Sequence, residues 1–219
     1  MESFVFGTSA LGMAIPAFKF GAEGPEILIL GGVHGNEVEG TSAAFGLLNK
    51  FCNKYEYKLK ITLVPAFNLD GVIKQNRLNG NGVDLNRNLP TKDWNPKAFD
   101  PKYPPGPSPT SEPENQALVQ FLEDTKPKFI LTLHSWYPLL NVNGNCLAEA
   151  KVLSRITGYE IKEEIGYPTP GCLGSYAGLE RNMPTLTYEI ERGLALDKVL
   201  AIHVPAILES LKATEKERA

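Results

Sequence analysis

The sequence lacks the features that mark secreted, membrane-spanning and nucleic-acid-binding proteins. Its three cysteines are an odd number without CxxC spacing, so we expect small buried side chains rather than disulfides or thiolate ligands. No run of lysine or arginine occurs, and the net charge of -3 argues against a nucleic-acid partner. The first residues combine neither a basic start nor a continuous apolar segment. We therefore expect no signal peptide, no membrane span and a cytoplasmic protein.

The composition predicts one α/β domain spanning residues 1–219. The length suffices for one sizeable core, and no shift in composition or internal repeat marks a second unit. Short apolar segments alternate with segments of helical periodicity, which predicts a mixed, mostly parallel sheet with helices on both faces. The expected strands are 26–33, 59–66, 129–133 and 185–188, after an edge hairpin within 4–20, and the expected helices are 37–50, 111–124, 146–157 and 196–212.

Three local signals refine these boundaries. Ser111 is expected to open the second helix through a capping box with Glu114. Residues 67–71 carry the Asn, Asp and Gly content of a turn, and Pro205 is expected to bend the last helix. The proline-rich segment 95–113 is expected to run extended over the surface, either arching over a cleft or connecting two elements.

Four of the expected strands end at a potentially reactive residue. These residues are His34, Asn68, His134 and Glu189. In open α/β sheets the ligand crevice lies outside the carboxyl ends of the strands, so these endings indicate a single active site.

A zinc site is expected among these strand ends. His34 and Glu37 are three residues apart where a buried strand becomes a helix, and imidazole nitrogen and carboxylate oxygen both suit zinc. A catalytic zinc commonly takes two histidines, one acid and a water, so a second histidine has to come from elsewhere. His134 at another strand end is the natural choice, whereas His203 lies within the last helix, away from any strand end.

The ordered motifs resemble those of the zinc metallocarboxypeptidases. The matching stretches are His34-Gly-Asn-Glu37, Asn68-Leu-Asp-Gly71, residues 82–90 (GVDLNRNLP), His134 and Thr187-Tyr-Glu189. Within that family, residues 81–88, 111–118 and 166–175 are most similar to the murein peptide amidase branch, whose members are bacterial γ-D-glutamyl-diaminopimelate amidases. The resemblance runs from about residue 7 to residue 195 and implies a single-domain zinc carboxypeptidase-like fold.

The resemblance implies a role for each matching catalytic residue. His34, Glu37 and His134 would hold one Zn²⁺ per chain. Glu189 would act as the general base. Arg77 would polarise the scissile carbonyl and stabilise the oxyanion.

Other matching residues are implied in substrate binding. Asn86 and Arg87 would bind the terminal carboxylate of the substrate, and Tyr167 would close over it from a glycine-rich loop. Asp84 would orient a zinc-bound histidine, expected to be His34. The residues that read the diaminopimelate side chain match no motif; the candidates are Ser175, Tyr176 and the segment 95–113.

The implied activity is zinc-dependent hydrolysis of the γ-D-Glu–meso-diaminopimelate amide in free murein tripeptide, which serves the recycling of bacterial cell-wall peptides. Alternatives that the residues leave open are a general or DL-carboxypeptidase, a deacylase of the succinylglutamate desuccinylase type, and a binding module without turnover. The expected partner is a small peptide, with no nucleic acid and no membrane. The protein is expected to be a monomer or a homodimer.

Overall fold

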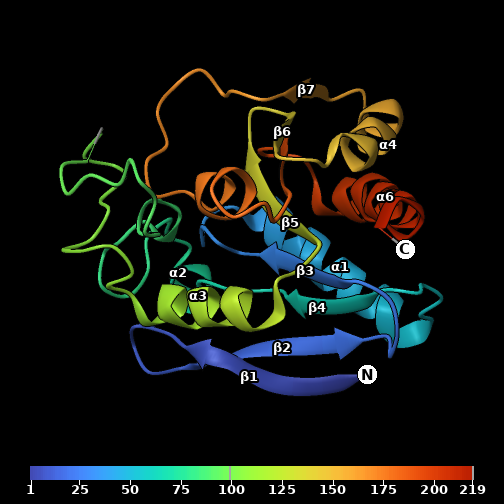
Figure 1. Cartoon of the computed structure of the whole chain (residues 1–219), viewed down its shortest axis with the longest axis horizontal. Helices are drawn as coiled ribbons and strands as arrows, with labels where there is room; N and C mark the ends of the chain where they lie inside the picture. Colours follow the sequence, from blue (N-terminus) through green and yellow to red (C-terminus); the bar gives the residue numbers. More distant parts are fainter. Residues whose placement is uncertain (99, 219) are drawn as a thin grey trace.

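The computed structural model describes residues 1–98 and 100–218 and contains one eight-stranded sheet (Figure 1). The strands in chain order are β1 (Glu2–Thr8), β2 (Ala14–Phe20), β3 (Glu26–Gly31), β4 (Lys60–Val64), β5 (Phe129–Trp136), β6 (Leu139–Asn143), β7 (Glu160–Lys162) and β8 (Thr185–Glu191). Their order across the sheet is β1-β2-β4-β3-β5-β8-β6-β7. The central strands β4, β3, β5 and β8 are parallel, while β1, β2 and β6 join antiparallel neighbours, so the predicted mixed, mostly parallel sheet is confirmed.

Helices cover both faces of this sheet, as predicted. They are α1 (Val38–Asn53), α2 (Leu69–Lys74), α3 (Pro113–Thr125), α4 (Leu147–Thr157), α5 (Leu196–Lys198) and α6 (Val204–Arg218), with π-helical turns at Gly174–Leu179 and Val199–His203. Helices α1, α4 and α6 share one core with the sheet, and α3 and the turn Gly174–Leu179 share the other. None of the helices in the described residues is long and apolar enough to cross a membrane.

The two cores explain why β3 is apolar at every position after Glu26. Ile27 and Ile29 point into the core beneath α1, and Leu28 and Leu30 point into the core beneath α3. Successive side chains of a strand face opposite sides, so a strand buried on both sides has no polar positions. Each fully buried aliphatic side chain contributes about 1.5–3 kcal/mol relative to exposure.

Two local predictions were wrong. Helix α2 begins at Leu69, inside the stretch predicted as a turn, because Asn68 caps it: the Asn68 Oδ1 accepts a hydrogen bond from the Gly71 N–H at 2.9 Å. At α3 the N-cap is Glu112, with no side-chain cap bond. The Ser111 hydroxyl donates instead to the Glu112 Oε1 at 2.7 Å, so the predicted capping box does not form.

The strand ends also differ from the prediction in a way that affects the site. Strands β5 and β8 continue past His134 and Glu189, which lie opposite each other in the parallel register. Strands β6 and β7 were not predicted. At the last helix, α5, a π-helical turn and α6 follow one another without a break, and the wider π-helical turn ends two residues before Pro205, whose ring removes one N–H from the helix.

Candidate metal centre and active-site cleft

Three buried side chains converge at the carboxyl ends of β3 and β5. His34 and Glu37 lie in the connection from β3 to α1, and His134 lies in β5. The Nδ1 atoms of both histidines lie 2.9 Å from oxygens of the Glu37 carboxylate, and 3.2 Å from each other. One ligand atom from each residue lies within 4.8 Å of the others, the arrangement of a metal site.

The donor set fits zinc. The His34 Nε2 lies 3.1 Å from the Asp84 Oδ1 and the Nδ1 faces Glu37, so the tautomer with its proton on Nε2 donates to Asp84 and leaves the Nδ1 lone pair for a metal. Burial alone would raise the pKa of Glu37, but the two neighbouring histidines hold it well below its usual range. Two imidazole nitrogens and an ionised carboxylate are the ligands of a catalytic zinc with an open fourth position.

Asp84 connects this centre to Arg77. The Arg77 Nε donates to the Asp84 Oδ2 at 2.9 Å, and its Nη1 donates to the Glu37 Oε1 at 3.3 Å. Asp84 is fully buried, and its interactions with His34, Arg77 and Arg87 outweigh the burial and lower its pKa. The expected contact between Asp84 and His34 is therefore present, and Arg77 is held at the rim of the same cleft.

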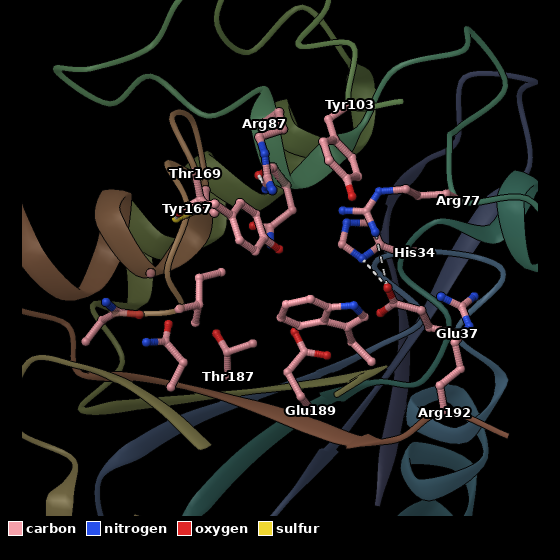
Figure 2. Close-up of a pocket in the computed structure, with 17 residues that line it drawn as sticks. His34, Glu37, Arg77, Arg87, Tyr103, Tyr167, Thr169, Thr187, Glu189 and Arg192 are labelled. Atoms are coloured by element: carbon pink, nitrogen blue, oxygen red, sulfur yellow. Dashed lines mark hydrogen bonds and ion pairs between the residues drawn. The ribbon is translucent and has the colours of Figure 1, made fainter. Parts of the chain in front are cut away.

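Glu189 faces the metal ligands across the floor of the cleft (Figure 2). Its Oε2 is buried and has no hydrogen-bond partner among the described residues. Burial raises the pKa of Glu189 to about 7, with His134 opposing and Glu37 reinforcing the shift. A carboxylate with a free oxygen and a pKa near neutrality has the properties of a general base.

Asn86 and Arg87 line the opposite wall. The Asn86 Oδ1 accepts a hydrogen bond from the Leu173 N–H at 2.9 Å, which turns the amide NH₂ towards the cleft as a donor. The Arg87 guanidinium is held by the Asn86 carbonyl at 2.6 Å and lies 5.3 Å from the ring centre of Tyr103. An amide donor beside a guanidinium suits a carboxylate ligand.

Tyr167 lines the cleft (Figure 2), and its ring is in contact with Trp136. The two rings meet edge to face, with centroids 5.7 Å apart. Burial raises the pKa of Tyr167, so its hydroxyl stays protonated and can donate. Of the side-chain candidates, Ser175 lies only in an outer hollow that continues the cleft. Tyr176 is buried in the core under α3 and stacked on Arg181, so the expectation that it contacts substrate is wrong.

Several residues of the cleft were not predicted from the sequence. They are Tyr103, Trp136, Asn141, Asn143, Thr187 and Arg192. Tyr103 lies in the proline-rich segment, which thus contributes to the cleft wall rather than only connecting two elements. Asn141 and Asn143 alternate with apolar residues in β6. This alternation is the sequence signal that could have predicted a strand with both asparagines on one face.

The chain is similar to a known family and to characterised relatives. The family model of the zinc carboxypeptidases (Peptidase_M14) matches residues 1–152. Murein peptide amidase A of Vibrio campbellii is 30% identical over 223 residues, which cover 94% of this chain and 86% of the relative. The Escherichia coli K12 protein of the same name is 32% identical over 206 residues, covering 84% and 79%.

Solved structures agree with this assignment. The murein-tripeptide amidase from E. coli O157 superposes with a TM-score of 0.78 at 26% identity, covering 94% of this chain and 90% of that one. Bovine thrombin-activatable fibrinolysis inhibitor gives a TM-score of 0.84 at 18% identity and shares the fold alone. The chain is therefore a hydrolase that belongs to the zinc carboxypeptidase (M14) family.

Proposed function

We propose that this protein is a zinc-dependent amidase that hydrolyses the bond between γ-D-glutamate and meso-diaminopimelate in free L-Ala-γ-D-Glu-meso-diaminopimelate. The observation that carries the proposal is that one cleft is lined by His34 and Glu37 of the candidate metal triad, by the unpartnered carboxylate of Glu189 and by the neighbouring Asn86 and Arg87. The relatives named murein peptide amidase A support this substrate. The proposal includes a cytoplasmic location and a role in recycling cell-wall peptides.

Substrate binding in this proposal begins with the terminal carboxylate. Asn86 and Arg87 together offer several N–H donors from one wall of the cleft, which Tyr167 also lines. A requirement for this carboxylate restricts the enzyme to the end of a peptide. Because the bond cut is adjacent to the anchored residue, the scissile amide is placed between Glu189 and the metal ligands.

The chemical step uses three groups of the protein. Zinc bound by His34, Glu37 and His134 would supply a Lewis acid that makes water nucleophilic near neutral pH. The Glu189 Oε2 accepts the proton of the attacking water and later returns it to the leaving amine. Arg77 has N–H groups beyond those bound to Asp84 and Glu37, and they stabilise the negative charge that develops on the carbonyl oxygen.

The test is to incubate the zinc-loaded protein with three peptides and identify the released products by chromatography. The peptides are the meso-diaminopimelate tripeptide, its L-Lys analogue and a plain L-peptide of the same length. Free diaminopimelate, released much faster than the other products, is the expected result. Release from the plain peptide alone would assign the chain to general carboxypeptidases, and no release from any would indicate a binding module.

A further inference from the structure

The active-site cleft continues beyond the catalytic groups into a second hollow. The cleft and this hollow form one continuous depression, in which the inner part has a volume of about 190 Å³ and the outer part about 440 Å³. The residues that line both parts are Asn141, Asn143, Ile165, Tyr167, Thr169 and Cys172. The inner part is lined by His34, Glu37 and Arg87, and the outer part extends to Glu163 and Glu164. When a substrate is anchored by its terminal carboxylate, the side chain of its leaving residue can extend into the outer hollow.

The floor of the extension is one face of the β6–β8 ladder. In the antiparallel register Leu139 pairs with Glu189, Asn141 with Thr187 and Asn143 with Thr185. Residues two apart on a strand share a face, so Glu189, Thr187, Asn141 and Asn143 point to the same side. Figure 2 shows Thr187 beside Glu189 on this floor.

The ladder also sets distances along the floor. At ~3.3 Å per residue, the row of Asn141 lies about 6.6 Å from Glu189, and the row of Asn143 lies about 13 Å away. In an extended diaminopimelate residue, seven bonds separate the scissile carbonyl carbon from the distal carboxyl carbon, which spans about 9 Å. The distal amino-acid group therefore falls between the two asparagine rows.

The two asparagines present opposite hydrogen-bonding groups. The Asn141 Nδ2 donates to the carbonyls of Lys162 at 3.1 Å and Glu163 at 3.0 Å, so both its N–H groups are used and its Oδ1 remains as an acceptor. The Asn143 side chain makes no hydrogen bond to the described residues, and because its amide atoms are not among their fully buried, unpartnered atoms, the amide is open to the cleft although Asn143 is only 8% exposed. An amide that lines a cleft and makes no hydrogen bond within the protein can donate its N–H groups to a ligand without breaking an internal bond.

Two glycines hold the Asn143 side chain in this position. A Cβ atom at Gly174 would collide with the Asn143 amide, and one at Gly178 would collide with its Cβ and backbone. Gly174 itself lines the cleft. The π-helical turn Gly174–Leu179 thus leaves room for the amide at the floor of the depression.

The outer hollow is lined by acidic side chains and, among the described residues, by no basic side chain. No lysine or arginine is among the residues that line it, whereas Glu163 and Glu164 are exposed at its far end. The acids and the Asn141 Oδ1 favour an ammonium group, and the Asn143 NH₂ favours a carboxylate. Neutral amides and a hydroxyl on the floor match neither an apolar side chain nor a single negative charge.

From this arrangement we infer that Asn143 is a specificity-determining residue that binds the distal carboxylate of diaminopimelate, while Asn141 accepts from its distal ammonium group. The inference rests on the proposed function and adds the residues that read the second amino-acid end. A lysine side chain has the ammonium but lacks the carboxylate. Asn143 therefore distinguishes a leaving residue that carries this distal carboxylate from one that lacks it.

The test is the ratio of kcat/KM for the meso-diaminopimelate tripeptide to kcat/KM for its L-Lys analogue. Asn143→Leu removes the donor at similar volume and should lower this ratio about tenfold to hundredfold. Asn143→Asp keeps the shape and adds a negative charge, so it should lower the ratio further and increase cleavage of the L-Lys peptide. Asn145→Leu is the matched control, because Asn145 is exposed and outside the cleft, and it should leave the ratio unchanged.

The ratio compares two substrates on one protein, so a general loss of activity in a variant does not mimic the effect. An unchanged ratio in both zinc-loaded Asn143 variants would overturn the inference. If the parent protein cleaves neither tripeptide, the proposed function fails. The dissociation constants of the same two peptides, measured by calorimetry on the parent and on Asn143→Asp, then decide the inference alone.

Discussion

Replacing Glu189 by Gln should nearly abolish turnover while leaving metal and substrate binding in place. The amide has the shape of the carboxyl group but cannot accept a proton from water. Glu189 makes no hydrogen bond to His34, Glu37 or His134, so the triad keeps its contacts in the variant. Because the Glu189 Oε2 has no partner in the described residues, the substitution also breaks no bond at that atom.

The magnitude follows from the position of this carboxylate. Burial raises the pKa of Glu189 to about 7, which matches a base that works near neutral pH. Positioned general bases typically contribute about 10²–10⁴-fold to the rate, equivalent to about 3–5 kcal/mol of transition-state stabilisation. We expect kcat to fall by that factor and KM to change little.

The assay is steady-state release of diaminopimelate from the tripeptide, together with zinc content measured on the same preparations. Glu191→Gln is the matched control, since Glu191 lies two residues further along β8, is exposed and does not line the cleft. The control should keep parental kinetics. A Glu189→Gln protein with full zinc content and a rate within about fivefold of the parent would refute the role of Glu189 as base.

Two further predictions concern the surroundings of the centre, and a third concerns the buried His203 in the π-helical turn before α6. Asp84→Asn should weaken zinc binding about 10–100-fold in competition with a chelator, because the His34 Nε2–H loses its charged acceptor; unchanged affinity would contradict the positioning role. Arg87→Lys should raise KM about tenfold with kcat less affected, since one ammonium cannot replace the guanidinium fork, and peptides with an amidated end should not distinguish the variant from the parent. Burial lowers the pKa of His203 to about 4, so the unfolded state binds the proton first as pH falls, and the free energy of unfolding should decrease by at most about 3 kcal/mol between pH 6.5 and 4. In His203→Gln, denaturant melts should show a shallower decrease over that interval, and an equal slope would contradict this explanation.

The sequence allowed the fold class and a candidate metal triad to be predicted, because apolar strands and the polar residues that follow them can be recognised from local patterns. The apolar run of β3 is continuous since both its faces are buried, and it is followed directly by His34 and Glu37. The end of a parallel strand is also the place where ligands bind, so His134 could be paired with them without knowledge of the strand order. The prediction failed for Asn68, which caps α2 and does not line the cleft.

The sequence did not predict the residues that reach the cleft through contacts between distant segments. Tyr103 reaches the cleft because the proline-rich segment places it against Arg77 and Arg87, and no periodic pattern encodes that path. Ser175 and Tyr176 are neighbours in sequence, but Ser175 lines the outer hollow whereas Tyr176 is buried in the core under α3. Successive residues of the turn Gly174–Leu179 face different surroundings.

The sequence by itself determined the alternation of strands and helices, the triad of His34, Glu37 and His134, and Glu189 as the candidate base. Only the tertiary structure decided which side chains share the floor with Glu189. The antiparallel register of β6 on β8 places Asn141 and Asn143 there, and β6 was not predicted from its five residues. The physical reason is that strand pairing and register depend on which distant segments bury each other, and this information is absent from the local order of residues.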